Sequence, residues 1–233
     1  MNNKNQTEYT YPNNNNINCD QAFNLKNSKI ILASASPRRL EILKAHGILP
    51  LVIPTNIDES ISVDMDKYEA VTFLARKKSL ACLDIIQSED FEYKTKLENF
   101  DKNHFSKKSD YIIIASDTVV YTDRILGKPA NKHEAYSMIK SIQGKSHEVI
   151  TGVSIIYSSD KSITSFYDVT KVYCVPMSDD EIMKYISTDE PYDKAGGYAI
   201  QGIFGKYIKK IDGDYENVVG LPFYKIKPYL QKL

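Results

Sequence analysis

The segment IILASASPRRLEILKAHG, residues 30–47, contains the signals that decide the fold class. Its first four residues are apolar, as expected for a short buried strand. Ser36 is a favourable helix N-cap, Pro37 suits the first helical position, and Gly47 suits the C-terminal cap. The segment is therefore predicted to form a strand, a tight turn and a helix.

The rest of the chain repeats this alternation. Tyr111 to Ala115 is the clearest strand, and Val119 to Tyr121 continues it after a polar break at Ser116-Asp117-Thr118. The other predicted elements are helices over residues 68–86, 131–144 and from 178, and strands over 148–157, 165–175 and 207–211. Strands that alternate with helices predict an α/β protein whose central sheet is covered on both faces.

Length and composition restrict the class of protein. The chain has 233 residues, within the range of one large domain or two closely joined lobes. Lys plus Arg and Asp plus Glu both number 30, and this neutral balance argues against a broad contact with nucleic acid. No apolar run reaches the ~20 residues of a membrane-spanning helix. The three cysteines are far apart, which is typical of reduced thiols and predicts a cytoplasmic protein.

Two segments differ from the remainder in composition. Residues 1–27 are rich in Asn and predicted to be a disordered tail, either tolerated low-complexity sequence or an arm for targeting or for binding a partner. The folded domain is expected over residues 28–233. Within it, residues 87–109 are polar and are interpreted as an inserted connection.

Two adjacent arginines, Arg38 and Arg39, fall in the first turn of the helix that Ser36 is expected to cap. Cations in a first turn oppose the helix dipole, whereas the backbone N–H groups there favour an anion. The pair is therefore a candidate phosphate or carboxylate site. The alternative is an exposed turn with solvated arginines.

Two carboxylates are candidates for chemistry. Asp117 directly follows an apolar strand, where burial of an acid without a partner is costly. Glu59 is the second candidate, and together they could hold Mg²⁺ and orient a water beside a phosphate. A turn at a strand end and a surface turn are the alternatives.

Three further residues could contact a nucleotide. Lys78 and Lys128 are suitable point charges for phosphate oxygens, although either could be a solvated surface lysine. Gln201 lies among glycines and carries a donor and an acceptor that could recognise the edge of a base. The alternative for that stretch is a glycine-rich hairpin. The four histidines lack metal-site spacing and are interpreted as structural or exposed.

Taken together, these segments resemble the Maf family of nucleoside triphosphate pyrophosphatases. The matching stretches are LASASPRR (32–39), DES (58–60), LAR (74–76) with Lys78, SDTVV (116–120), GKP (127–129), GKSHEV (144–149), TGV (151–153), EPYDKAG (190–196), IQG (200–202) and NVVGLP (217–222). The match runs from about residue 30 to residue 230, interrupted by the polar insertion. Lys77 stands where the family often has an acid, and Ser79 where it often has Ala.

The resemblance implies a mixed sheet, two lobes and a cleft between them, as in inosine triphosphate pyrophosphatases. It implies a divalent cation, Mg²⁺ or Mn²⁺, and a homodimer. The expected reaction is hydrolysis of dTTP and UTP to the monophosphate and pyrophosphate. Alternatives are another nucleotide, such as 7-methyl-GTP, or a non-catalytic regulator of cell division.

The resemblance also implies roles for individual residues. Asp117 matches the proton acceptor, and Glu59 matches a carboxylate that handles metal or water. The positions implied to bind substrate are Arg38, Thr118 and Gln201, which match positions tied to substrate choice, and Arg39, Lys78 and Lys128, which match phosphate contacts.

Overall fold

The computed structural model of the chain describes residues 28–62, 64–88 and 110–230. The predictions for the tail at 1–27 and for nearly all of the polar insertion lie outside the described residues.

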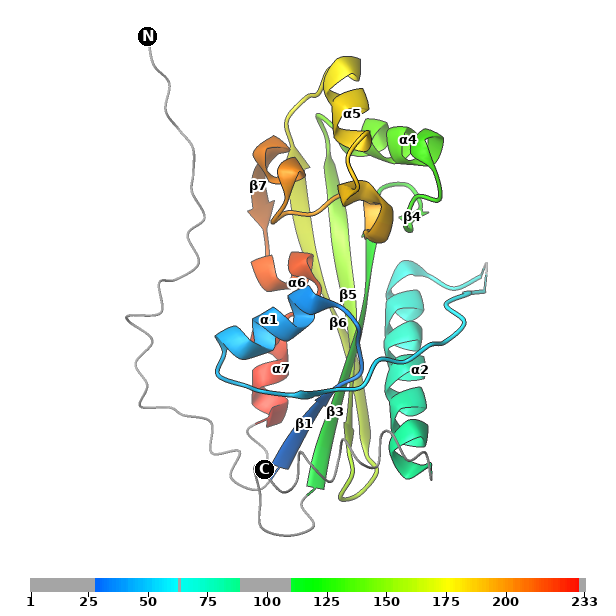
Figure 1. Cartoon of the computed structure of the whole chain (residues 1–233), viewed down its shortest axis with the longest axis vertical. Coiled ribbons are helices and arrows are strands. Elements are labelled where there is room, and N and C mark those ends of the chain that lie inside the picture. Colours follow the sequence, from blue (N-terminus) through cyan, green and yellow to red (C-terminus); the bar gives the residue numbers. More distant parts are fainter. Residues whose placement is uncertain (1–27, 63, 89–109, 231–233) are drawn as a thin grey trace.

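A mixed sheet forms the centre of the molecule (Figure 1). In the described residues it has seven strands, and the strand order is β2-β1-β3-β5-β6-β7, with β4 paired to β3. β1 is parallel to both β2 and β3, while the other pairs are antiparallel. The strands are β1 (Ser28–Leu32), β2 (Leu51–Val52), β3 (Asp110–Tyr121), β4 (Ile125–Leu126), β5 (Ser146–Tyr157), β6 (Ile163–Cys174) and β7 (Ile208–Asp212). The expected mixed α/β fold is confirmed.

Helices cover both faces of the sheet. They are α1 (Pro37–Ala45), α2 (Lys67–Gln87), α4 (Lys132–Ile142), α5 (Asp179–Ile186), α6 (Tyr215–Val219) and α7 (Phe223–Leu230), with the 3-10 helices η2 (Glu190–Asp193), η3 (Ala195–Gly197) and η4 (Ile203–Tyr207). Successive strand residues point to opposite faces. Accordingly, Ile112 and Ile114 pack with α1, α6 and α7, whereas Ile113 packs with α2. Figure 1 shows α2 on one side of the strands and α1 and α7 on the other.

Two lobes share the three long strands. The lower lobe in Figure 1 contains β1, β2, α1 and α7, and the upper lobe contains α4, α5, β7 and the 3-10 helices. Strands β3, β5 and β6 each have twelve residues and run through both lobes. A separate apolar cluster, which includes Val120, Ile139 and Phe204, fills the upper lobe. The lobes are therefore two packed ends of one sheet.

Helix α2 lies unusually close to the sheet at Gly152. A Cβ atom at this position would lie 2.3 Å from the backbone oxygen of Val71, so only glycine permits the approach. Gly152 is also the cross-strand neighbour of Asp117. At its N-terminus, α2 has a capping box formed by Asp66 and Glu69. The close packing brings the next turns of α2 over the middle of β3.

Several local predictions were wrong or incomplete. The polar break predicted at 116–118 does not exist, because β3 is continuous from Asp110 to Tyr121. Strand β5 pairs with this segment on one side, and the side chains of Arg39 and Lys78 supply its other partners, so polar side chains do not end the strand. Strands β2 and β4 and helices α6 and α7 were not predicted. The two strands have two residues each and α6 has five, too few to show a periodic pattern, and α7 contains Pro228.

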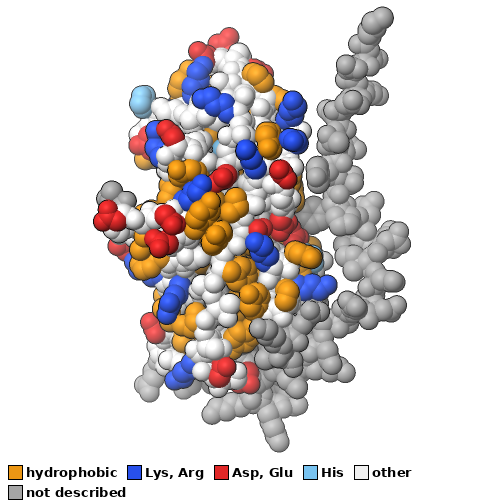
Figure 2. Space-filling view, turned by 180° about the vertical axis from the view of Figure 1, so that it is seen from behind, with side chains coloured by type: hydrophobic (Ala, Val, Ile, Leu, Met, Phe, Trp, Pro, Cys, Tyr) orange, Lys and Arg blue, Asp and Glu red, His pale blue; other side chains and the backbone are white. Residues whose placement is uncertain are grey.

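The face seen from behind carries charges of both signs (Figure 2). Of the described residues on this face, neither sign forms a continuous surface, and hydrophobic side chains form a broken band between them. This agrees with the equal numbers of basic and acidic residues. Among the described residues, no helix has the length and apolar composition required to cross a membrane.

Candidate active site

The candidate site lies at a gap, where one edge of β3 has no neighbouring strand among the described residues. The last β1 pair joins Leu32 to Ile114, and the first β4 pair joins Leu126 to Val120. Between these pairs, the described residues include no strand that covers this edge of β3, so its backbone groups need other partners. A cleft of about 700 Å³ opens here and is lined by residues of both lobes.

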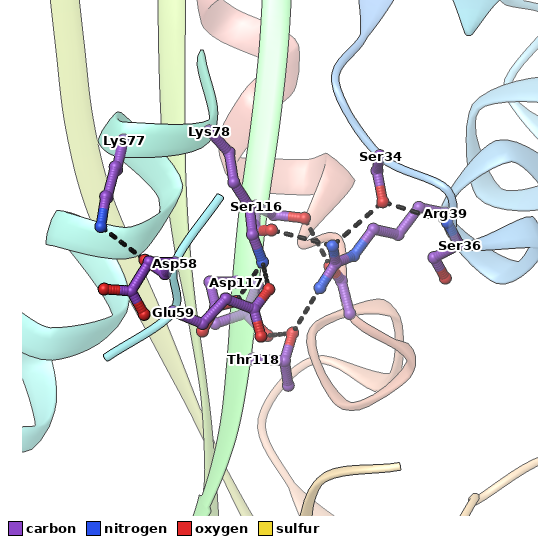
Figure 3. Close-up of polar contacts among 12 residues, drawn as sticks. Ser34, Ser36, Arg39, Asp58, Glu59, Lys77, Lys78, Ser116, Asp117 and Thr118 are labelled. Atoms are coloured by element: carbon purple, nitrogen blue, oxygen red, sulfur yellow. Dashed lines mark hydrogen bonds and ion pairs between the residues drawn. The ribbon is translucent and has the colours of Figure 1, made fainter. Parts of the chain in front are cut away.

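Three charged side chains meet on the α2 side of the gap (Figure 3). The Nζ atom of Lys78 lies 2.6 Å from Oδ1 of Asp117 and 2.7 Å from Oε1 of Glu59. The side chains of Lys78 and Asp117 are only 12% and 11% exposed, whereas Glu59 is 50% exposed. The two predicted acids are thus brought together, by a lysine that was predicted separately. We call Asp117, Glu59 and Lys78 the acid cluster.

The charges around Glu59 keep it ionised. Partial burial alone would raise the pKa of Glu59, but the hydrogen bond from Lys78 and the charges of Lys78, Lys128 and Arg39 outweigh burial and lower the pKa. The contribution of Lys128 shows that its charge faces the cluster. Glu59 therefore presents a carboxylate to the cleft at neutral pH.

A second lysine fixes the loop that carries Glu59. Lys77 donates a hydrogen bond to the backbone oxygen of Asp58 (2.5 Å), and the Asp58 carboxylate accepts one from the backbone N–H of Ser60 (2.9 Å). Consecutive lysines on α2 therefore hold this loop at two adjacent residues. Lys77 is one of the two departures from the family pattern, and the structure gives it this contact.

Arg39 lies on the opposite side of β3, and nearly all of its N–H groups donate hydrogen bonds within the protein. Its Nε donates to the backbone oxygen of Gly220 (3.0 Å), and Nη1 donates to Ser34 Oγ (3.1 Å) and to the backbone oxygen of Ser116 (2.8 Å). Its Nη2 donates to Thr118 Oγ1 (3.3 Å). We call these contacts the Arg39 network.

The network covers the open edge of β3 and joins distant segments. Ser116 Oγ also donates to the Gly220 oxygen (3.0 Å), and Thr118 Oγ1 shares a hydrogen bond with Thr151 Oγ1 (3.0 Å). Four hydrogen bonds leave Arg39 one of its five N–H groups for a ligand. Burial lowers the pKa of Arg39, and the nearby charge of Asp117 opposes that effect. Arg39 is thus first a structural residue, and its predicted phosphate contact stays a prediction.

Arg38, Lys128 and Gln201 also line the cleft, and their substrate contacts stay predictions. Within residues 28–62, 64–88 and 110–230, none of their side chains makes a hydrogen bond or a close ion pair. Burial alone would raise the pKa of Asp193, but the hydrogen bond and charge of Lys194, together with the smaller effect of the Arg38 charge, lower it. Arg38 on the lower lobe therefore faces an acid of the upper lobe across the cleft.

The helix cap at Ser36 differs from the prediction. Ser36 is the N-cap residue of α1, but its side chain makes no capping hydrogen bond. Instead, Ser34 Oγ accepts from the backbone N–H of Ser36 (3.2 Å). The first turn of α1 has no acidic side chain, and it lines the cleft, so it favours an anion there.

The sequence did not single out several residues of the site. Gly220, Ser34 and Ser116 matter through backbone atoms or short hydroxyls, which leave little sequence signal. Asp193 stands in a stretch that was quoted only as part of the resemblance. His147 is buried, as interpreted, and His133 is exposed, while His104 lies outside the described residues.

The acid cluster is chemically suited to a divalent cation with a phosphate ligand. Mg²⁺ is commonly held by one or two carboxylates together with substrate phosphates. Asp117 and Glu59 supply two carboxylates that face one space. No group of three or more His, Cys, Asp or Glu that could hold a metal occurs among the described residues. The residues present therefore fit a cation that the substrate helps to bind.

Comparisons with known proteins agree with the resemblance. The sequence profile of the family described as Maf-like protein matches residues 29–233. The chain is 45% identical over 206 residues to the dTTP/UTP pyrophosphatase of Caldicellulosiruptor bescii, covering 88% of this chain and 94% of that protein. It is 41% identical to the dTTP/UTP pyrophosphatase of Alkaliphilus oremlandii, covering 85% and 92%. Among solved structures, it is similar to the Staphylococcus aureus Ham1 protein, with a TM-score of 0.39 and 11% identity over 88% of this chain and 98% of that one.

Proposed function

This chain belongs to the Maf family, and from that membership we propose that it hydrolyses dTTP and UTP to the nucleoside monophosphate and pyrophosphate. The observation that carries the proposal is the acid cluster, in which Lys78 joins Asp117 and Glu59 inside the cleft. Relatives that are 38–45% identical over most of the chain are named dTTP/UTP pyrophosphatases, which supports the choice of nucleotide.

The groups of the cleft account for binding of a triphosphate. Arg38, Lys128 and the first turn of α1 supply positive charge that the described residues leave without hydrogen-bond partners. Gln201 also lines the cleft, where its amide offers both a donor and an acceptor. Thymine and uracil present the same pattern, an N–H between two carbonyl oxygens. The amide is therefore assigned to the base, and the cations to the phosphates.

Asp117 is proposed as the proton acceptor. The oxygen of a water forms a bond to the α-phosphorus, and the bond from that phosphorus to the α,β-bridging oxygen breaks. Pyrophosphate leaves with the electron pair, and Asp117 takes the proton of the water. Lys78 holds the Asp117 carboxylate in a fixed position, while Lys78 and Lys128 stabilise charge on the leaving pyrophosphate.

Glu59 and Asp117 would hold the divalent cation, Mg²⁺ or Mn²⁺. When bound, it neutralises phosphate charge in the cleft. Thr118 is tied to Thr151 and Arg39, and so shapes the floor of the cleft beside Asp117.

The proposal extends to the cellular context. An enzyme of this kind removes non-standard or excess nucleotides. The buried thiols Cys82 and Cys174, whose pKa values burial raises to about 12, are consistent with the expected reduced, cytoplasmic setting. The homodimer is proposed on the family resemblance alone.

A nucleotide panel tests the proposal. Pyrophosphate and monophosphate are measured with dTTP, UTP, dCTP, dGTP, ITP and 7-methyl-GTP, each with Mg²⁺, with Mn²⁺ and with chelator. We expect fastest release from dTTP and UTP and none with chelator. Fastest release from 7-methyl-GTP or ITP would replace the proposed substrate. Binding of the nucleotides without any products would support a regulator that does not turn over.

A further inference from the structure

Gln201 needs an ordered backbone if its amide is to recognise a base. Gln201 is exposed and lies in the turn between η3 and η4. Its side chain makes no hydrogen bond to any residue in the described part of the chain. A loop that has to be ordered during binding loses affinity through conformational entropy. The contacts that fix this turn in the free protein are therefore important for recognition.

The first anchor lies directly after Gln201. The Glu190 carboxylate accepts hydrogen bonds from the backbone N–H groups of Ile203 (2.7 Å) and Phe204 (3.2 Å). The hydroxyl of Tyr185 donates a third hydrogen bond to it (3.1 Å). A Cβ atom at Gly202 would lie 2.4 Å from the Glu190 carboxyl group, so any other residue there would displace the carboxylate from this position. The carboxylate thus caps the N-terminus of η4.

The second anchor lies before Gln201. The Tyr198 hydroxyl and Nε2 of His147 are 2.6 Å apart in a hydrogen bond, and both residues are buried. His147 belongs to β5, which runs through both lobes. Burial lowers the pKa of His147 to about 4 and raises that of Tyr198, so both groups are neutral at neutral pH. This pair connects the turn to the central sheet.

We propose that Glu190 and Tyr198 are positioning residues that hold the Gln201 amide toward the cleft and thereby set the preference for a pyrimidine base. The anchors enclose residues 199–202, and residues 198–201 line the cleft. Neither anchor reaches the acid cluster, so each acts through Gln201 rather than on the reacting phosphorus. The inference rests on the proposed function and deepens it.

A double-mutant cycle tests the proposal. The readout is selectivity, the kcat/KM for dTTP divided by that for dGTP, with thermal unfolding measured in parallel. Glu190→Gln replaces one acceptor oxygen by an NH₂ group that opposes a backbone N–H. We expect Glu190→Gln to lower selectivity about tenfold through KM, with kcat within about twofold. In the Gln201→Ala background, Glu190→Gln should cause no further loss, because both act through one amide.

Glu181→Gln is the matched control. Glu181 also accepts hydrogen bonds as a helix cap, at α5 of the same lobe, but it does not line the cleft. It should leave selectivity unchanged even if it lowers the unfolding temperature. Unchanged selectivity in Glu190→Gln, or an equal loss in both backgrounds, would overturn the inference for Glu190.

Tyr198→Phe provides a second test if Glu190→Gln fails to fold. It removes only the hydroxyl, and we expect the same loss of selectivity, absent in the Gln201→Ala background. Full selectivity in Tyr198→Phe would overturn the role of Tyr198. These outcomes differ from failure of the proposed function, in which the unmodified protein itself would release no pyrophosphate from dTTP.

Discussion

The two faces of β3 at the cleft differ in how far the protein uses its own charged groups. On one face, four N–H groups of the Arg39 guanidinium donate hydrogen bonds to three segments of the chain, at Ser34, at residues 116–118 and at Gly220. On the other face, Glu59 is half exposed, and Asp117 has a second carboxylate oxygen beside the one bonded to Lys78. Side chains at consecutive positions of one strand therefore serve different purposes.

The difference separates groups that build the cleft from groups that can act in it. A charge whose donors are filled by backbone oxygens lowers the energy of the fold and has little left for a ligand. A charge that is held by one neighbour still has capacity for a phosphate, a water or a cation. Arg38 and Arg39 show this contrast within one helical turn, since the described residues leave the Arg38 guanidinium without a hydrogen bond.

Asp117→Asn should have the largest effect, and its main effect should be on the chemical step. The amide has the shape of the carboxylate but cannot accept the proton, so we expect kcat for dTTP to fall by ~10²–10³ or more. Asp123→Asn is the control, because Asp123 is fully exposed in the turn after β3. Pyrophosphate release and circular dichroism are the measurements. A native rate in Asp117→Asn would show that another group takes the proton.

Arg39→Lys should mainly affect stability. An ammonium group cannot reach acceptors on Gly220, Ser116 and Thr118 at once, and the buried backbone oxygens lose a charged donor. We expect the free energy of unfolding to fall by about 2–4 kcal/mol. Urea unfolding measures it, with an unchanged slope as the check on two-state behaviour. Arg38→Lys is the matched control, and equal losses in both variants would contradict the contrast between these arginines.

How much of this contrast the sequence could predict depends on the kind of contact. Asp117 and Glu59 are conspicuous as acids beside apolar or turn segments, and the resemblance placed both in one site. The Arg39 network could not be predicted, because its acceptors are backbone oxygens of residues far apart in the chain. The sequence therefore predicted both arginines as phosphate ligands, whereas in the structure most N–H groups of Arg39 donate to the protein itself.

The fold followed the same rule. The long periodic elements, such as α2 and the β5–β6 pair, were predicted close to their actual bounds. The break predicted in β3 was wrong, because polar residues at 116–118 are satisfied by tertiary partners that local pattern does not reveal. Helices α6 and α7 are five and eight residues long, and α7 contains Pro228, so neither shows a long periodic pattern. For α6 the only local signals are its end residues, Asp214 and Gly220.

The pH dependence of stability should distinguish the buried, neutral His147–Tyr198 pair from the charged Arg39 network. Arginine stays charged at acid pH, so the Arg39 network should contribute equally over that range. The pKa of His147 is lowered from its usual 6.5 to about 4 by burial. Below pH 6.5 this residue becomes protonated in the unfolded chain but stays neutral in the folded protein. The free energy of unfolding therefore falls as the pH decreases toward 4.

The expected slope is at most about 1.4 kcal/mol per pH unit, and the total is about 3 kcal/mol. Urea unfolding from pH 7.5 to 4 measures it in the native protein and in His147→Phe. The variant should be less stable at neutral pH but should lack this part of the acid slope. His133→Phe, at an exposed histidine of α4, is the control. Identical slopes in native protein and His147→Phe would show that His147 already takes up its proton near its usual pKa.

Arg38→Ala should have the smallest effect. In contrast to Arg39→Lys, it should change substrate binding and leave stability nearly unchanged. With no hydrogen bond to the described residues, the Arg38 side chain can be removed with a change in unfolding free energy within about 0.5 kcal/mol. The KM for dTTP should rise about tenfold, because one charged contact to phosphate is lost.

Added salt should raise the KM of the native protein more than that of Arg38→Ala, since salt screens the charge that the variant lacks. Arg124→Ala, at an exposed arginine before β4, should change neither quantity. If Arg38→Ala instead lowered stability and left the KM unchanged, both arginines would belong to the scaffold, and the phosphate charge would have to be carried by Lys128 and the first turn of α1.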